Sequence, residues 1–438
     1  MEYDVVIVGG GITGTSLLYS LSRFTDIKNI LLIEKYSDFA MLNSNARSNS
    51  QTLHFGDVET NYTVEKAIKT KKASEYILNY IRNSTEKDEK IIQKCQKMVL
   101  GVGDEEVKML EETYQNIKSV FPGLKKIGKE ELKKIEPNVI NGRNPGEKIL
   151  ALLSDNGYMV NFGMLSSSFA KKARLNNKNI EIKFDTEVKK AKIENGLYKL
   201  ETNKGNISSK FVVFAAGTYS LYFAKMFGYD QNLSILNIGG GFYYSKRFLN
   251  GKVYRVQHGH IPFAAIHADP DITNPDITRY GPTVTLSLTL ERGHIKTFPD
   301  YIRTFNIDIS TLISLKRILL DRDIRRIIQN NAVYSIPVIG KYQFLKKEAK
   351  IIIPKLSYGD LHINNNTGGI RPQIIDENKK FITMGEAKLQ KEGLIFNITP
   401  SPGASSCLGN ALEDVIYIIK YLGKNFDINK FNKELGGG

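Results

Sequence analysis

The sequence predicts an α/β fold with a parallel sheet, and three apolar runs support this class. Residues 5–8 form a run of strand type that leads directly into a glycine-rich turn and then into a helical pattern. Residues 30–33 form a second run, which ends on an acidic residue. Residues 211–214 form a third run that ends in small residues and is typical of a buried parallel strand. The order strand, helix, strand at the start of the chain predicts a Rossmann-like unit.

The glycine-rich turn has the spacing of a dinucleotide-binding loop. Gly9 allows the tight turn, Gly11 lets backbone amides approach a pyrophosphate, and Gly14 lets the helix pack closely on the strand. The start of the helix adds oriented N–H groups and the positive end of the helix dipole. Glu34 stands twenty residues beyond Gly14, where an acidic side chain accepts hydrogen bonds from a ribose. We therefore predict that these four residues bind a dinucleotide.

Four segments have the pattern of helices. Residues 64–84 and 104–120 carry apolar residues at helical spacing with one polar face. Residues 306–331 read as a basic helix. A last apolar helix begins near Ser405 and runs through Ile419, after a proline-rich turn.

Residues 179–202 have the pattern of a β-hairpin region. Apolar and polar side chains alternate along them, as they do in half-buried strands. Asn195-Gly196 lies inside this region and is a strong signal for a two-residue turn. We expect two antiparallel strands on either side of that turn.

Composition limits the classes of protein that remain. The chain has 438 residues, enough for two intertwined domains, and no apolar stretch reaches the roughly eighteen residues of a spanning helix. Two cysteines, without zinc spacing, favour a reducing cytoplasm and predict no metal site. The formal net charge of +15 favours nucleic acid, an anionic membrane or a polyanionic substrate as partner, although scattered lysines also fit a general bias in composition.

The predicted cofactor site draws on distant parts of the chain. A nicotinamide dehydrogenase usually keeps its nucleotide site within one contiguous half of the fold. Here the strand ends and helix starts that fit one site come from both ends and from the middle of the sequence: residues 7–15, 43–56, 211–220 and 396–408. This arrangement indicates a flavin bound by an interrupted domain.

Ten stretches of the sequence resemble a known family. They are residues 48–57, 59–63, 97–98, 101–106, 136–139, 262–271, 279–283, 336–341, 369–373 and 396–408. The chain resembles FAD-dependent dehydrogenases of 2-hydroxy acids with the D-amino-acid-oxidase-like fold, and within them the shorter type of malate:quinone oxidoreductase. The sequence that the longer type carries after the second strand is absent. Several stretches, including those around Asn49, His54 and Phe263, also resemble L-2-hydroxyglutarate dehydrogenase.

The resemblance implies a fold and a reaction. It implies a discontinuous Rossmann-like FAD-binding domain interrupted by a mixed-sheet substrate domain; the first has residues 1–75, 145–225 and 365–438, and the second has residues 76–144 and 226–364. We expect oxidation of L-malate to oxaloacetate by non-covalent FAD, with quinone as electron acceptor. A dehydrogenase of another acid, such as L-2-hydroxyglutarate, is the alternative. A third hypothesis is an RNA-modifying flavoprotein, prompted by the charge, although no RNA-binding module is recognisable.

Oxidation of a 2-hydroxy acid requires a base, a hydride acceptor and cations for the carboxylates. Among six histidines, His267 ends a strand-like run before a loop, and His54 lies where such folds pass the flavin; both are candidates for the base. Arg371, between Gly369 and Pro372, is the first candidate for a carboxylate ligand, because its planar fork suits bidentate binding. The further candidates for contact with substrate are Gln51, Arg279 and Tyr254.

Several short segments are predicted to contact FAD beside the glycine loop. The first is the Ser/Asn-rich stretch after the second strand, and the last is the turn of small residues before the final helix, whose amides face flavin oxygens. The predicted contacts are Ser48, Asn49, Ser50, Val188, Ala216, Gly217, Gly369, Pro402, Gly403, Ala404 and Ser405. Cys407, just inside the helix, is expected to pack rather than to form a flavin thioether.

A quinone acceptor requires contact with a membrane. Residues 314–328 place five cations among apolar residues, which fits a basic amphipathic helix on anionic lipid as well as an ordinary helix with a solvated face. From the resemblance we expect a cytoplasmic protein, peripheral on the inner face of the cytoplasmic membrane. No nucleic acid is expected as partner, and the sequence leaves the oligomeric state open.

Overall fold

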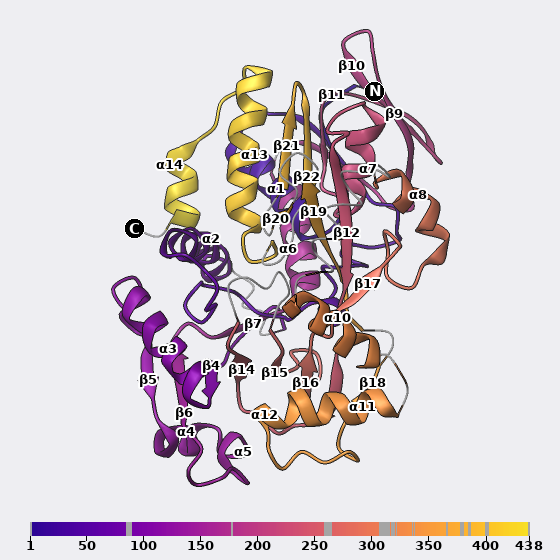
Figure 1. The fold of residues 1–438 in the computed structure, drawn as a ribbon. Coiled ribbons are helices and arrows are strands. Elements are labelled where there is room, and N and C mark those ends of the chain that lie inside the picture. Colours follow the sequence, from indigo (N-terminus) through magenta and orange to yellow (C-terminus); the bar gives the residue numbers. More distant parts are fainter. Residues whose placement is uncertain are drawn as a thin grey trace.

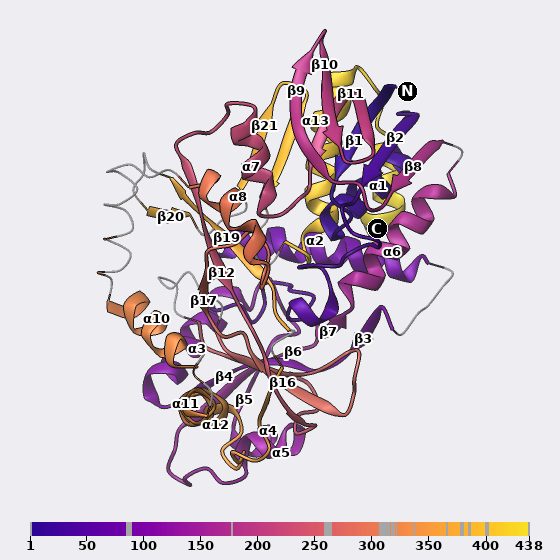
Figure 2. The ribbon, with the colours of Figure 1, turned by 90° about the vertical axis from the view of Figure 1, so that its right-hand side faces the viewer.

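A computed structural model describes most of the 438 residues (Figure 1). The described ranges are 2–84, 90–176, 178–257, 265–305, 316, 320, 322–334, 336, 338–364, 367–376, 381–383, 387–398 and 403–436. Two large sheets lie at opposite ends of the molecule, and a smaller sheet lies between them (Figure 2). The α/β class predicted from the sequence is confirmed.

The first sheet holds the predicted Rossmann-like unit. Strand β1 (Glu2–Val8), helix α1 (Ile12–Phe24) and strand β2 (Asn29–Ile33) follow one another, and β1 pairs in parallel with β2. The sheet order is β21-β22-β11-β1-β2-β8, so that β11 (Gly205–Phe214), from the middle of the chain, lies beside β1. Its other strands are β8 (Asn179–Lys183), β21 (Ala387–Lys391) and β22 (Leu394–Ile398).

Apolar side chains on both faces of this sheet are buried. Val5 and Ile7 of β1 pack with helices α1, α6 (Phe162–Arg174) and α13 (Cys407–Leu422). Val6 and Val8 face the other way, toward α7 (Tyr219–Met226). A sheet covered on both faces explains why its strands read as continuous apolar runs.

The hairpin predicted within residues 179–202 extends the first sheet over residues 188–202, whereas residues 179–183 form β8, which pairs in parallel with β2. Strands β9 (Val188–Glu194) and β10 (Leu197–Thr202) are antiparallel, and β10 pairs with β11. Between the two strands, Asn195 and Gly196 have φ of 52° and 74°. Positive φ at both turn residues matches the right-handed twist of the strands, which confirms the Asn-Gly turn.

The second sheet is mixed and has the order β18-β13-β16-β15-β14-β4-β6-β5. Strands β14 and β4 pair in parallel, whereas the remaining neighbours are antiparallel. Its strands are β4 (Lys97–Val102), β5 (Lys125–Ile127), β6 (Ile149–Ser154), β13 (Tyr243–Lys246), β14 (Lys252–Arg255), β15 (His267–Pro270), β16 (Ile277–Gly281) and β18 (His362–Ile363). Its core includes side chains of α4 (Lys129–Ile135), α5 (Pro137–Ile140), α11 (Ile339–Phe344) and α12 (Lys350–Ile352).

The third sheet has the order β17-β12-β19-β20 and joins the two ends of the molecule (Figure 2). Its strands are β12 (Leu233–Gly239), β17 (Thr285–Ser287), β19 (Ile370–Asp376) and β20 (Phe381–Thr383). Strands β3 (Ile92–Lys94) and β7 (Tyr158–Val160) form a separate pair. Strands β6 and β19 depart from the predicted division into domains. Both lie in ranges predicted for the FAD-binding domain, yet β6 pairs with β4 and β19 pairs with β12, and both partners lie in ranges predicted for the substrate domain.

The predicted helices have these bounds. Residues 64–84 correspond to α2 (Val64–Arg82), and residues 104–120 correspond to α3 (Asp104–Ile117). The predicted basic helix is described as α10 (Arg322–Tyr334), and most of its residues before Arg322 lie outside the described part of the chain. The remaining helices are α8 (Phe298–Arg303) and α14 (Ile428–Phe431). Within the described ranges, no helix has the length and apolar character needed to cross a membrane.

Candidate active site

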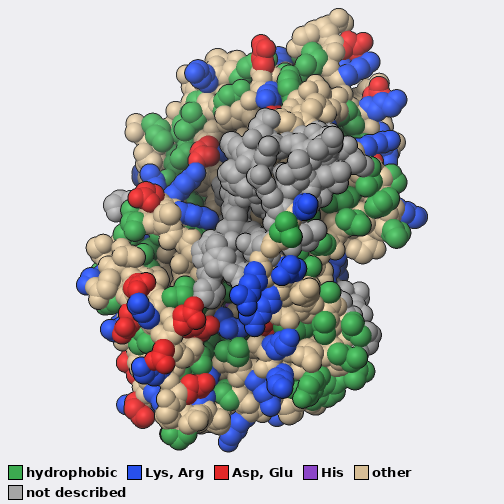
Figure 3. Space-filling model, in the orientation of Figure 1, with side chains coloured by type: hydrophobic (Ala, Val, Ile, Leu, Met, Phe, Trp, Pro, Cys, Tyr) green, Lys and Arg blue, Asp and Glu red, His purple; other side chains and the backbone are tan. Residues whose placement is uncertain are grey.

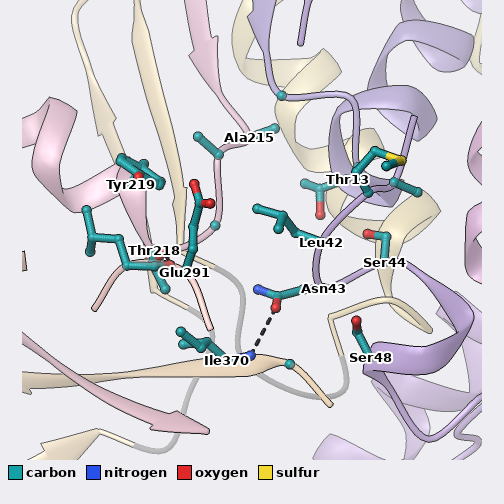
Figure 4. A pocket seen from close by; sticks show the side chains of 18 of the residues that line it. Thr13, Leu42, Asn43, Ser44, Ser48, Ala215, Thr218, Tyr219, Glu291 and Ile370 are labelled. Atoms are coloured by element: carbon teal, nitrogen blue, oxygen red, sulfur yellow. Dashed lines mark hydrogen bonds between the residues drawn. The ribbon is translucent and has the colours of Figure 1, made fainter. Parts of the chain in front are cut away.

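A cavity of about 920 Å³ lies where the parallel strands β1, β2 and β11 end (Figure 4). The sequence predicted that four segments meet at one site, and the cavity is lined by residues from all four of them. These lining residues fall within 8–13, 43–54, 215–219 and 403–405. The structure therefore brings together both ends and the middle of the chain. Ligand pockets usually measure roughly 300–1,000 Å³, so this one has room for a molecule as large as a flavin dinucleotide.

The glycine loop forms one wall through very close backbone contacts. Gly9 has φ of +115°, and a Cβ there would lie 2.4 Å from the Ala215 carbonyl oxygen. A Cβ on Gly14 would lie 2.0 Å from the Gly9 carbonyl oxygen, so α1 could not pack against the turn. Gly9 and Gly11 line the cavity, whereas Gly14 lies behind it in the contact between helix and turn. These positions suit a bound pyrophosphate.

Glu34 lines the same wall at the end of β2. Its Oε2 accepts a hydrogen bond of 2.7 Å from Gly10 N, and its Oε1 accepts one of 2.9 Å from Tyr36 N. Burial raises the pKa of the carboxyl. Each carboxylate oxygen keeps a further lone pair for a ribose hydroxyl, so this end of the cavity fits the nucleoside part of FAD.

The loop after β2 lines the cavity beside the start of α1. Ser44 Oγ accepts a hydrogen bond of 3.0 Å from Ile12 N, at the start of α1. Asn43 Oδ1 accepts one of 3.0 Å from Ile370 N, which ties the loop to β19 (Figure 4). A Cβ on Gly369 would lie 2.7 Å from the Ser48 carbonyl oxygen, so only glycine permits this approach. Asn43 was not predicted, because its role depends on a partner far along the chain.

The structure places most of the predicted FAD contacts on the cavity surface. Besides the residues above, Ser48, Asn49, Ser50, Val188, Ala216, Gly217, Gly369, Gly403, Ala404 and Ser405 line it. Pro402 lies outside the described residues. Cys407 is buried in α13 and is not among the lining residues described, so no sulfur of that residue faces the cavity there.

His54 reaches the cavity at the end away from Glu34. Its Nδ1 lies 2.5 Å from Glu59 Oε1, and its Nε2 lies 3.5 Å from Ser50 Oγ. Its backbone N donates a hydrogen bond of 2.9 Å to Ser405 Oγ, so the turn before α13 fixes the loop that carries the histidine. Burial opposes ionisation of Glu59, but Lys97 and His54 lower the pKa of its carboxyl to about 2.

His267 lies deeper, on β15, and is not among the described residues that line the cavity. Its Nδ1 lies 2.5 Å from Asp269 Oδ1. The ring of Tyr254 packs against it, with 4.7 Å between centroids, and is itself 6.3 Å from the ring of His54. Burial lowers the pKa of His267, against the raising effect of Asp269. Tyr254 thus separates the two histidines.

Three predicted substrate contacts have other partners. Arg279 is fully buried, donates to the backbone oxygens of Asn49 and Ser50 at 3.1 and 3.0 Å, and pairs with Asp269. Gln51 Nε2 donates to Asp271 Oδ2 and to the Ala46 carbonyl oxygen, and its Oε1 accepts a hydrogen bond from Ile272 N. Tyr254 makes a hydrogen bond of 2.6 Å with Thr52 Oγ1. None of these three side chains is among the described cavity-lining residues, and they hold the 49–52 segment in place from behind.

Arg371, by contrast, lines the cavity, and it interacts electrostatically with Tyr254, whose ring lies 6.3 Å from that of His54. It lies on β19, opposite Ile238 of β12. Burial lowers the pKa of its guanidinium. Among the residues that the structure describes, Arg371 forms no ion pair, which leaves its positive charge available to an anion in the cavity.

The structure also brings residues to the cavity that no pattern in the sequence indicates. Lys35 pairs with Glu291, and Tyr36 donates its hydroxyl to the same carboxylate, near the Glu34 end. Arg292 donates to the Gly240 carbonyl oxygen. Glu291 and Arg292 belong to a segment after β17, and tertiary packing alone carries it to the cavity. In the described part of the chain, no cluster of three or more His, Cys, Asp or Glu side chains is arranged for a metal ion.

Comparison with known proteins agrees with this geometry. The family model for malate:quinone oxidoreductase matches residues 1–280. A probable malate:quinone oxidoreductase of Campylobacter jejuni is 39% identical over 447 residues, covering 99% of both chains. A malate:quinone oxidoreductase of Helicobacter pylori is 38% identical and covers 99% of this chain and 98% of its own. The chain belongs to the malate:quinone oxidoreductase family.

Solved structures of flavoproteins share the fold. The L-α-glycerophosphate oxidase of Mycoplasma pneumoniae, solved with FAD bound, superposes with a TM-score of 0.66 at 19% identity over 97% of this chain and 96% of that one. The glycine oxidase of Geobacillus kaustophilus gives a TM-score of 0.65 at 15% identity, over 96% and 95% of the two chains. The D-amino-acid-oxidase-like fold implied by the resemblance is therefore confirmed.

Proposed function

We propose that this protein oxidises L-malate to oxaloacetate with FAD and passes the electrons to a quinone. Membership of the malate:quinone oxidoreductase family supports the reaction. The observation that carries the proposal is the partly buried Arg371, free of ion pairs among the described residues, which lines the same cavity as His54 of the His54–Glu59 pair. A cation for a carboxylate and a base for a hydroxyl are what a 2-hydroxy acid requires.

The cavity fits FAD through a series of separate contacts. The glycine loop and the start of α1 suit the pyrophosphate, Glu34 suits the ribose, and the small residues 403–405 allow close approach of a flat ring. When bound, FAD supplies the acceptor for the hydride from C2 of malate. We propose that it is held without a covalent bond, because Cys407 is buried in the helix.

His54 is the proposed base. Its Nδ1 faces Glu59, so Nε2 is the nitrogen left for the hydroxyl proton of malate. His267 keeps a supporting role, since it packs on Tyr254 and is not among the described residues that line the cavity. The sequence leaves both histidines as candidates, and the geometry favours His54 over His267.

Arg371 is the proposed ligand of a malate carboxylate. Its guanidinium can donate two parallel hydrogen bonds to one carboxylate, and binding neutralises a charge that burial disfavours. We do not propose direct contact of Gln51 or Arg279 with substrate, because their polar atoms bind Asp271, Asp269 and the backbone. Tyr254 shapes the wall behind His54.

We propose a division into two domains that follows the sheets. The FAD-binding domain comprises residues 1–75, 145–225 and 365–438 without β6, and the substrate domain comprises residues 76–144 and 226–364 together with β6, because β6 pairs with β4 and β5. His54 then belongs to the first domain and Tyr254 to the second. The reacting end of the cavity lies where the two domains meet.

We further propose peripheral attachment to the inner face of the cytoplasmic membrane. Val338, Ile339 and Tyr342, at the start of α11, are 69%, 56% and 52% exposed. Hydrophobic side chains gather beside Lys and Arg over this part of the surface (Figure 3), and Arg322, Arg325 and Arg326 of α10 are exposed nearby in sequence. Sedimentation with anionic vesicles, weakened by salt and absent with neutral vesicles, is expected; equal recovery with both would refute electrostatic attachment.

Anaerobic mixing with L-malate, L-lactate and L-2-hydroxyglutarate tests the reaction. L-malate should bleach the flavin fastest, and a quinone analogue should restore its colour, whereas NAD should not. Faster bleaching by L-2-hydroxyglutarate would show that this acid, the alternative, is the preferred substrate. Reduction of NAD would refute the flavin–quinone reaction.

A further inference from the structure

We propose that Glu59 is the positioning residue of His54, within a buried charge cluster that also contains Asp57 and Lys97. The inference rests on the proposed function, in which His54 takes the hydroxyl proton of malate. It adds residues that lie behind the cavity surface and that no catalytic pattern in the sequence indicates.

The contact between His54 and Glu59 is short and sheltered. Nδ1 of His54 lies 2.5 Å from Oε1 of Glu59, and the side chains are 13% and 10% exposed. The second oxygen, Oε2, accepts a hydrogen bond of 3.3 Å from Val58 N. The carboxylate is thus fixed at both oxygens, and it accepts a hydrogen bond from the Nδ1–H group of a neutral imidazole.

Lys97 supplies the positive charge behind this pair. It lies on β4 with no exposed side-chain surface, and its Nζ is 2.6 Å from Asp57 Oδ1. Ser154 donates its hydroxyl to the other oxygen of Asp57. A buried lysine retains its charge only beside acids, and here both Asp57 and Glu59 raise its pKa against the effect of burial.

The charges around His54 favour its protonated form in the transition state. Asp57 and Glu59 contribute two negative charges and Lys97 one positive charge, so the cluster keeps a net charge of −1 that an imidazolium neutralises. Tyr254, from β14, is the other titratable side chain beside the ring, and Arg371 lies beyond it.

The charged groups around His267 have a different net charge. Lys252 and Arg279 balance Asp269 and Asp271 there, so the four charges sum to zero and no net negative charge is left for an imidazolium. Two histidine–carboxylate pairs of the same Nδ1–oxygen distance, 2.5 Å, therefore differ in net charge and in access to the cavity. Both differences favour His54 as the group that accepts a proton.

The proposed step is a simple proton transfer. The O–H bond of the malate hydroxyl breaks while an N–H bond forms at His54 Nε2, and Glu59 keeps the Nδ1 proton through a hydrogen bond. Glu59 stabilises the resulting imidazolium without becoming protonated, because Lys97 and His54 keep its pKa at about 2. The two electrons leave C2 with the hydride, as the established chemistry of FAD enzymes requires.

Glu59→Gln tests the proposal, since glutamine keeps the size but loses the charge. In FAD-loaded enzyme we expect flavin reduction by saturating L-malate to slow on the order of 10²-fold, within the range that a positioned base supplies. The acid limb of the rate profile should move to lower pH, because the variant loses a negative charge within hydrogen-bond reach of the imidazole. Glu59→Asp should recover part of the rate.

Glu106→Gln is the matched control. Glu106 is 15% exposed, pairs with Arg255 and is not among the described cavity-lining residues, so its rate and pH profile should match the wild type. If Glu59→Gln also matches the wild type while His54→Gln loses flavin reduction, the role of Glu59 is refuted and the base assignment stands. If His54→Gln itself reduces normally, the proposed base is wrong.

A spectroscopic readout does not depend on turnover. In the imidazole ¹⁵N spectrum of the wild-type holoenzyme above neutral pH, the His54 signals, identified by their loss in His54→Gln, should show a proton on Nδ1 and none on Nε2. A proton on Nε2 instead would overturn the proposal.

Discussion

Replacing Arg371 by methionine should weaken malate binding and stabilise the substrate-free protein at the same time. The side chain is partly buried, lines the cavity and forms no ion pair among the described residues, and desolvation lowers the pKa of its guanidinium. Loss of a charge-assisted hydrogen bond costs about 1.5–3 kcal/mol, so malate affinity should fall about 10- to 150-fold. Removal of this unpaired cation should raise the free energy of unfolding of the substrate-free protein by on the order of 1 kcal/mol.

Thermal unfolding of the FAD-loaded enzyme, with and without L-malate, measures both effects. Without malate, Arg371→Met should melt above the wild type. At a malate concentration of about 100 times its Kd, the wild type should gain about 2.7 kcal/mol, whereas the variant should gain much less. Arg371→Lys is the control, because it keeps the charge but loses the planar fork, and it should bind malate weakly without the gain in stability.

The reasoning fails if the variant melts below the wild type in the absence of malate. That result would mean that Arg371 has a structural partner and is not held ready for substrate. Equal stabilisation of wild type and Arg371→Met by malate would show that the carboxylate binds elsewhere.

Two further outcomes follow from the glycine loop and from Glu59. Gly14→Ala places a Cβ 2.0 Å from the Gly9 carbonyl oxygen, so FAD affinity measured by fluorescence titration should fall about 10- to 100-fold. Gly128→Ala is the control, because open space surrounds its Cβ, and it should leave the affinity unchanged. Equal FAD affinities in the two variants would refute the packing role of Gly14. The pKa of Glu59, lowered from 4.5 to about 2, contributes stability that is present above pH 4.5 and is lost as the pH falls toward 2. Urea unfolding across that range should therefore show a shallower loss in Glu59→Gln than in the wild type, and parallel curves would contradict the lowered pKa.

The FAD-binding half of the site could be predicted because its signals are local. The glycine spacing, Glu34 at the end of β2 and the small residues after β11 each depend on backbone geometry within a few residues. The same holds for Asn195-Gly196, whose positive φ values follow from the turn type. Such features are legible in a single sequence because no distant partner is needed to define them.

The catalytic half depended on contacts that sequence order does not reveal. His267 and His54 each have a carboxylate close by in sequence, at Asp269 and Glu59, so pattern alone cannot rank them. The ranking comes from the position of Tyr254 between their rings and from the cavity surface.

Arg279 and Gln51 illustrate the same limit. Both are polar residues in stretches that resemble the family, yet the fold turns them toward Asp269, Asp271 and the backbone. Their burial could be known only once β16 and the 49–51 segment were packed together.

Single-turnover reduction of the bound flavin by L-malate, in wild type and in His54→Gln, tests the central claim most directly. Both proteins should carry equal amounts of FAD, since His54 contributes no cofactor contact that depends on its charge. We predict rapid bleaching in the wild type and bleaching slowed on the order of 10²–10⁴-fold in the variant. Equal rates in the two proteins, or no bleaching of the wild type by L-malate, would contradict the account.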